Sequence, residues 1–130
     1  MKPIIVNNSK VPVILSKFSP IDIWAITIWP YVFCRGEMNE GTVNHESIHI
    51  EQYNDLFVVV FLLIYLIDYL RGCVKYRNDL SGVGPHGPYQ SVGSKAYFRT
   101  RAEQEAYDND DNLNYLSERK RYEWLKKYKV

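Results

Sequence analysis

The residues best suited to chemistry form a His-Glu-x-x-His run made by His45, Glu46 and His49. Residues four apart lie on one face of an α-helix, so the imidazoles of His45 and His49 are expected to point the same way. Two neutral imidazoles in that arrangement can bind one Zn²⁺ and leave the rest of its tetrahedral coordination open. The spacing therefore predicts a zinc site.

Glu46 follows the first histidine directly and would lie within reach of a water molecule held by the metal. A carboxylate there can accept a proton from the water while the metal polarises a carbonyl group, which is the chemistry of a zinc hydrolase. The alternative is that the motif arose by chance on an ordinary amphipathic helix. A zinc hydrolase also needs a third protein ligand further along the chain, and the sequence can be searched for one.

Two glutamates in a later helical segment are candidates for the third ligand. Glu103 and Glu105 are two residues apart, so only one of them can face the metal. Glu103 is favoured because Ala102 and Ala106 lie on nearly the same face, where small side chains allow close helix packing, and Glu105 is then expected in solvent. Both could instead belong to a charged outer face. His86, in a Gly/Pro-rich loop, is a further candidate for a metal ligand or a substrate contact.

The composition predicts a single domain over residues 1–130. The chain is 46% hydrophobic, which is enough for a core. Its formal charge is only +1, so no overall positive electrostatic field indicates a nucleic-acid partner. Cys34 and Cys73 are too few for a four-cysteine zinc site, and two free thiols are expected rather than a bridge. The first residues lack the pattern of a signal peptide, so a cytoplasmic location is expected, with peripheral membrane association as an alternative.

Short β-branched segments indicate strands in the first forty residues. Segments 4–6 and 11–15, separated by Asn-Asn-Ser-Lys, are expected to form a hairpin or two edge strands. Segment 21–29 is expected to be a strand that continues after Pro30 through 31–34. Such a strand could hold an extended peptide by main-chain hydrogen bonds, or it could only cover the apolar face of the helices.

The middle of the chain predicts one long helix. Neither glycine nor proline occurs between Thr42 and Arg71, and Thr42 or Asn44 could cap the helix start. The part from Leu56 to Leu70 is apolar apart from Asp68. Fifteen helical residues cover about 22 Å, less than a hydrocarbon layer of about 30 Å, so this part is expected to be buried in the protein. A membrane or oligomer contact is the alternative.

The last third of the chain predicts a loop and one or two helices. Glycines and prolines mark 80–94 as a loop, and helical segments are expected at 95–107 and 113–128. The acidic connector 108–111 could cap the last helix or orient a ligating histidine. The basic face of 113–128 is expected in solvent, with an anionic surface as the alternative partner. Together the segments predict an α+β fold, mainly helical, with a small N-terminal antiparallel sheet.

Beyond these patterns, the sequence from residue 20 to the C-terminus resembles a family of short, uncharacterised bacterial proteins regarded as zinc metallopeptidases of the gluzincin type. The likeness rests on the His-Glu-x-x-His-x-x-Gln run with an apolar helix behind it, and on the segments at 96–97, 103–107 and 115–126. It implies a minimal zincin-like domain that hydrolyses peptide or protein substrates. In that pattern Glu103 is the third zinc ligand beside His45 and His49, and Glu46 is the general base.

One position departs from the gluzincin pattern. Tyr107 stands where many members have an aspartate that holds a metal-binding histidine, and Asp108 is one residue further on. The oxyanion of a tetrahedral intermediate also needs a stabiliser, for which Tyr97, Tyr107 and His86 are candidates. The alternative to a peptidase is a non-catalytic structural or interaction protein that keeps this fold. It would join a larger assembly or a membrane through Leu56 to Leu70 or the basic C-terminal segment.

Overall fold

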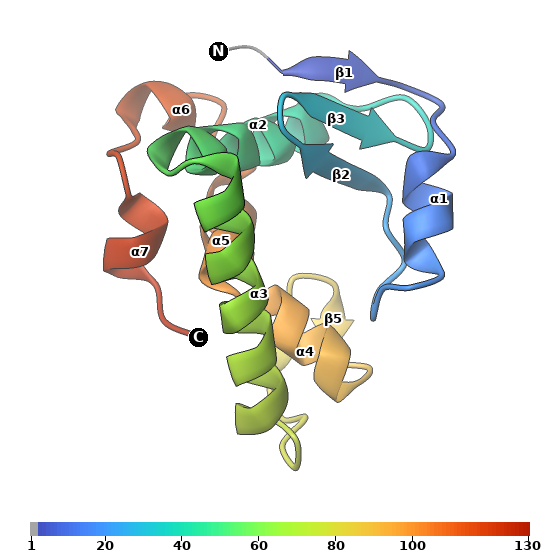
Figure 1. Cartoon of the computed structure of the whole chain (residues 1–130), viewed down its shortest axis with the longest axis vertical. Coiled ribbons are helices and arrows are strands. Elements are labelled where there is room, and N and C mark those ends of the chain that lie inside the picture. Colours follow the sequence, from blue (N-terminus) through green and yellow to red (C-terminus); the bar gives the residue numbers. More distant parts are fainter. Residues whose placement is uncertain (1–2) are drawn as a thin grey trace.

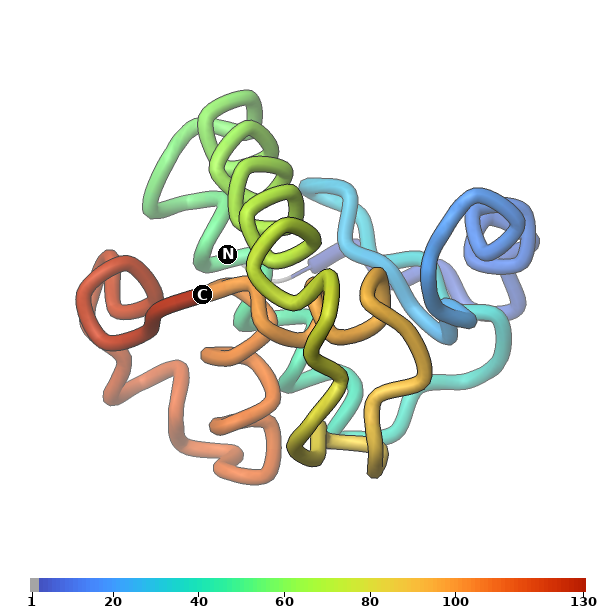
Figure 2. The backbone as a smooth tube through the Cα atoms, turned by 90° about the horizontal axis from the view of Figure 1, so that it is seen from below, coloured from blue at the N-terminus to red at the C-terminus, as the bar shows by residue number. Residues whose placement is uncertain are grey.

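The computed structural model describes residues 3–130, which form seven helices and five short strands. The fold is α+β, as the sequence predicted. Helix α3 (Val58–Lys75) stands between a three-stranded sheet on one side and α6 (Tyr115–Glu118) and α7 (Glu123–Lys127) on the other (Figures 1 and 2). The two helices that carry the candidate site, α2 (Glu40–Asp55) and α5 (Arg101–Asn109), pack against each other.

The sheet consists of β1 (Ile4–Val6), β2 (Ala25–Ile28) and β3 (Tyr31–Cys34), in the order β1-β3-β2. Strand β1 runs parallel to β3, and β2 runs antiparallel to β3. Two sequence predictions are therefore wrong. Segment 21–29 is a strand only in its second half, and 31–34 turns back after Pro30 to form a hairpin instead of continuing the strand.

Segment 11–15 is also not a strand, because it lies in helix α1 (Val11–Ser16). Pro12 stands in the first turn of α1, where its missing N–H would have no helical partner in any case. Its buried ring anchors this helix. The partner of β1 is consequently β3 rather than 11–15.

The predicted long helix is two helices, α2 (Glu40–Asp55) and α3 (Val58–Lys75), whose axes differ by 112°. The break contains neither glycine nor proline; Leu56 and Phe57 take extended conformations there, and side-chain contacts hold the bend. The Tyr53 and Phe61 rings lie 4.1 Å apart across it, and Asp55 is held in an ion pair with Arg119. The cap prediction is also wrong, since Asn39 accepts the hydrogen bond that caps α2.

Helix α3 packs through one face only. At Gly72 a Cβ would lie 2.9 Å from the Ala96 Cα, so α3 and α4 approach too closely for a larger residue. Asp68 is fully buried and pairs with Arg101 at the start of α5. The expected burial of segment 56–70 is wrong, because much of its apolar surface is in solvent, with Leu63 54% exposed.

No single helix among the described residues has the length and apolar character needed to cross a membrane. Helices α2 and α3 pass that test only as a pair, by length and composition, and the pair is sharply bent.

The C-terminal half holds a small hairpin, β4 (Val83–Gly84) with β5 (Gly87–Pro88), and four short helices. Their bounds are α4 (Val92–Phe98), α5 (Arg101–Asn109), α6 (Tyr115–Glu118) and α7 (Glu123–Lys127). The predicted helix at 95–107 divides at Thr100, whose side chain caps α5. The predicted helix at 113–128 divides because Arg119 takes an extended conformation and enters the core.

Candidate metal centre

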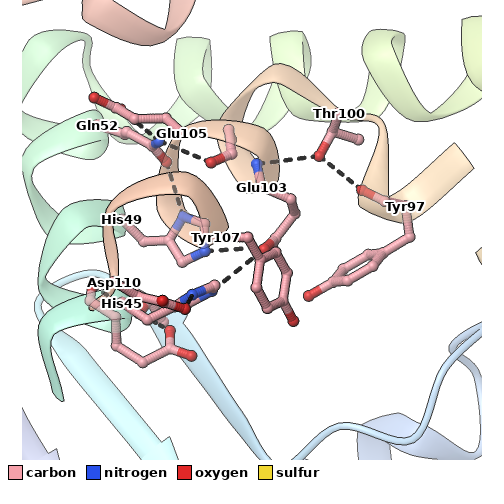
Figure 3. A network of polar contacts seen from close by, with 12 residues as sticks. His45, His49, Gln52, Tyr97, Thr100, Glu103, Glu105, Tyr107 and Asp110 are labelled. Atoms are coloured by element: carbon pink, nitrogen blue, oxygen red, sulfur yellow. Dashed lines mark hydrogen bonds and ion pairs between the residues drawn. The ribbon is translucent and has the colours of Figure 1, made fainter. Parts of the chain in front are cut away.

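The structure brings His45, His49 and Glu103 together between α2 and α5 (Figure 3). Glu103 Oε2 lies 3.4 Å from His45 Nε2, and Glu103 Oε1 lies 3.3 Å from His49 Nε2. One ligand atom from each residue falls within 4.8 Å of the other two. All three residues are buried. We call them the triad.

The charges of the triad shift the pKa values of its histidines and its glutamate in opposite directions. Burial disfavours the charged forms of both histidines, yet the facing carboxylate outweighs burial for His49 and raises its pKa. Burial likewise acts to raise the pKa of Glu103, but the two imidazoles hold it well below its usual range. Without a cation, protons on the histidines therefore balance the glutamate charge.

The triad fits a divalent cation. Glu103 Oε2 is one of three side-chain polar atoms in the described residues that are buried without a hydrogen-bond partner. This oxygen faces His45 Nε2 at 3.4 Å, and its buried negative charge needs either a proton on that ring or a bound cation. Two imidazole nitrogens and one carboxylate oxygen form a donor set that suits Zn²⁺ and leaves a coordination position open.

His45 is oriented by Asp110, whose Oδ2 lies 3.1 Å from His45 Nδ1. The loop that carries Asp110 is held to α2 by Asn44, whose side-chain amide donates to three backbone carbonyls between residues 109 and 112. The acidic connector thus supplies a partner for a triad histidine. Asp108, the residue singled out from the gluzincin pattern, is instead exposed.

His49 is oriented by Gln52, whose Oε1 lies 2.8 Å from His49 Nδ1. Gln52 in turn donates to Glu105 Oε1 at 2.8 Å. The expectation of a solvated Glu105 is therefore wrong, since this residue is fully buried. Arg119 pairs with both Glu105 and Asp55, so it also lies in the core and not on a solvated basic face.

Glu103 is held by Tyr65 of α3, whose hydroxyl donates to Glu103 Oε1 at 2.9 Å. Burial and the nearby carboxylate raise the pKa of Tyr65 well above its usual value, so the phenol remains a donor. Tyr65 lies within the segment that the sequence marked only as apolar. Its role depends on the bend between α2 and α3, which the sequence did not predict.

Glu46 is buried and lines a groove together with His49 and Glu103. Its Oε2 accepts a 2.6 Å hydrogen bond from Thr27 Oγ1 of β2. The Thr27 carbonyl accepts a hydrogen bond from the Tyr53 hydroxyl, which ties β2 to α2. No sequence signal identified Thr27, because its contact depends on how the sheet docks against the helix.

The three candidates for an oxyanion donor lie in different places. Tyr97 is on α4 and lines the groove beside Glu103. Tyr107 packs against His45, with ring centroids 4.4 Å apart. His86 is exposed and outside the triad, with its Nε2 3.4 Å from the Tyr107 hydroxyl. His86 is therefore not a metal ligand in this arrangement.

A groove of about 470 Å³ opens onto this centre. Glu46, His49 and Glu103 line it, together with residues of β2, α3 and segment 15–23. The candidate base and two triad members are thus accessible from one cavity. The two cysteines take no part, and Cys34 and Cys73 are both free thiols.

Searches of protein-family models, curated proteins and solved structures return no match to this chain.

Proposed function

We propose that this protein is a zinc-dependent peptidase in which His45, His49 and Glu103 bind the metal and Glu46 is the general base. The observation that carries the proposal is the convergence of the buried triad, with Glu46 and two of its members lining one open groove. An ordinary amphipathic helix would leave its histidines solvated. Here four ionisable side chains are buried together, at the cost of their hydration.

A bound Zn²⁺ would polarise the scissile carbonyl and lower the pKa of a water molecule. Glu46 would accept the proton of the attacking water and pass it to the leaving amine. Thr27 holds the Glu46 carboxylate in one orientation by its short hydrogen bond. A fixed carboxylate loses less entropy when the reacting atoms are brought together.

Tyr97 is the favoured donor to the developing oxyanion. Burial and the charge of Glu103 raise its pKa well above the usual value, so its hydroxyl stays protonated at neutral pH and can donate. The pKa of Tyr107 is raised for the same reasons. Tyr97 is preferred because it lines the groove with Glu46, whereas Tyr107 is engaged with the rings of His45 and His86.

Metal analysis of the purified protein tests the proposal. We expect one zinc per chain in the wild-type protein and in His86→Ala, whose ring lies outside the triad, and none in His49→Ala. The zinc-loaded wild-type protein should then cleave members of a peptide mixture, as detected by mass spectrometry. Stoichiometric zinc that survives His49→Ala would contradict the ligand assignment, and zinc binding without peptide turnover would contradict the peptidase.

A second candidate is a non-catalytic interaction protein. It is favoured by the apolar side chains that α3 exposes, among them Val59 at 68% and Val74 at 66%. Large exposed apolar patches often mark interaction sites. This candidate predicts that Glu46→Gln changes no measurable activity, which separates it from the peptidase.

A further inference from the structure

The groove that leads to the triad has apolar walls. On one side, α3 contributes Leu62 and Leu66, and on the other, segment 15–23 contributes Leu15, Phe18 and Ile23. Strand β2 lies between α1 and α3 (Figure 1), and its residues 25–27 also line the groove. Leu62 and Leu66 are 48% and 51% exposed, and Phe18 is 85% exposed. These apolar side chains are therefore exposed to solvent along a concave surface. A surface of this kind favours the binding of an apolar ligand.

The charges of the groove restrict the ligand further. Among the described lining residues, Glu46 and Glu103 are the charged groups besides His49, and all three belong to the candidate metal centre. No lysine or arginine of the described chain lines the groove. Away from the metal centre the groove therefore offers no cation to an anionic group of the ligand. A neutral, apolar group fits the walls.

Strand β2, which lines the groove, favours a polypeptide as the occupant. Strand β2 is at the edge of its sheet, because the strand order is β1-β3-β2, and of its backbone groups the Thr27 carbonyl is already bonded to the Tyr53 hydroxyl. An edge strand can pair with an extended chain by main-chain hydrogen bonds, while side chains of that chain enter neighbouring pockets. An acyl chain would use the apolar walls but not the backbone of β2.

We propose that the groove binds an extended peptide with a large aliphatic or aromatic side chain next to the scissile bond, and that Leu62 and Leu66 determine this specificity. This inference rests on the proposed peptidase function, since the triad defines the scissile bond. Loss of a well-placed apolar contact typically lowers kcat/KM by about tenfold or more. The effect should be confined to substrates that carry the apolar side chain.

Helix α3 offers a matched pair of variants for the test. Leu66 lines the groove, whereas Leu63 does not, and the two are exposed to nearly the same degree, 51% and 54%. Leu66→Asp should lower kcat/KM at least tenfold for peptides cleaved beside a large apolar residue. Leu63→Asp should leave it within about twofold of wild type. Zinc content and melting temperature, measured on both variants, establish that each is folded and loaded.

Binding is measured separately from turnover. Zinc-loaded Glu46→Gln protein is titrated with a fluorescent peptide taken from the wild-type cleavage sites, or with a Leu/Phe-rich peptide if the wild type cleaves none. Fluorescence anisotropy should show a Kd that Leu66→Asp weakens about tenfold and Leu63→Asp does not. A peptide of the same length with charged residues at the apolar positions should bind weakly to all three proteins.

The outcomes distinguish the proposed peptide specificity of the groove from the proposed peptidase activity. Peptide binding that depends on Leu66 without any cleavage by wild type would support the groove and contradict the peptidase. Cleavage with no preference for apolar residues, or equal losses in both variants, would overturn the groove specificity and leave the peptidase standing. Binding to phosphatidylcholine vesicles that Leu66→Asp abolishes, with peptide turnover unchanged, would identify a lipid chain as the occupant and also overturn the proposal.

Discussion

The side-chain carbonyl of Gln52 accepts a hydrogen bond from the Nδ1–H of His49 at 2.8 Å. The amide group of Gln52 donates to the Ala102 carbonyl and to Glu105, so its orientation is set by two partners on α5. This arrangement keeps the proton on Nδ1 and turns Nε2 toward Glu103. A residue three positions after the motif therefore holds its second histidine in a form suited to a metal.

Gln52→Met should weaken zinc binding. Methionine has similar length but neither the carbonyl that fixes His49 nor the amide that joins α2 to α5. Loss of such a partner typically lowers metal affinity by 10-fold to 100-fold. Competition with a zinc-binding dye measures the change. Asn54→Ala is the control, because Asn54 is exposed on the same helix away from the triad, and comparable affinities for the two variants would refute the role of Gln52.

Substitution of Glu103 should abolish zinc binding, whereas substitution of Glu105 should lower the free energy of unfolding. Glu103→Gln removes the triad carboxylate charge, so stoichiometric zinc should be lost. Glu105→Gln keeps the triad but breaks one of the two ion pairs of buried Arg119, and disruption of a buried pair typically costs about 3–5 kcal/mol of unfolding free energy. Zinc analysis and denaturant unfolding measure both effects. Zinc loss in Glu105→Gln, with retention in Glu103→Gln, would reverse the ligand assignment.

Zinc affinity should rise with pH. Burial opposes the charged form of His45, but the carboxylates of Asp110 and Glu103, which face its two ring nitrogens, outweigh burial and raise the pKa from 6.5 to about 10. In the metal-free protein, this protonated form contributes stability that is complete below pH 6.5 and is lost as the pH rises through about 10. Because Zn²⁺ needs neutral imidazole, its binding near neutral pH must release this proton.

The affinity should therefore increase about tenfold per pH unit for each proton released, over roughly pH 6.5 to 9. Zinc titrations in buffers of different ionisation enthalpy count the protons, and competition with a chelator gives the affinity at each pH. His86→Ala should leave the slope unchanged, because His86 is outside the triad. An affinity independent of pH would mean that the histidines are already neutral in the metal-free protein.

Glu46→Gln should leave the fold and the zinc content nearly intact and abolish peptide hydrolysis. Glutamine keeps the shape of the side chain and can still accept the hydrogen bond from Thr27, but it cannot take a proton from the attacking water. The loss should appear in kcat, by about 10²- to 10⁴-fold, and less in substrate binding. Steady-state kinetics on a cleaved peptide measure it, and undiminished turnover would exclude Glu46 as the base.

The α+β class and the candidate triad could be predicted from sequence because both follow from local rules. Two histidines four apart share a helix face whatever the rest of the fold does. Glu103 was preferred over Glu105 because two small alanines flank its face, and the structure brings that face of α5 against α2. These are short-range properties of a single helix.

Other predictions were wrong because contacts between distant residues overrode local preference. Nothing between Thr42 and Arg71 signals a helix end, yet the core contacts of Tyr53 and Asp55 turn the chain there. That bend brings Tyr65 of α3 onto Glu103. Local propensity is a weak prior, and burial of distant partners decides such cases.

The sequence by itself thus determined which side chains could bind a metal and the helix face on which they lie. The tertiary structure decided what surrounds them. Thr27 reaches Glu46 only because the sheet docks on α2, and Glu105 is buried only because Arg119 enters the core to neutralise it. The physical reason is that a buried charge or hydrogen-bonding group needs a partner, and the sequence does not state which distant residue will supply it.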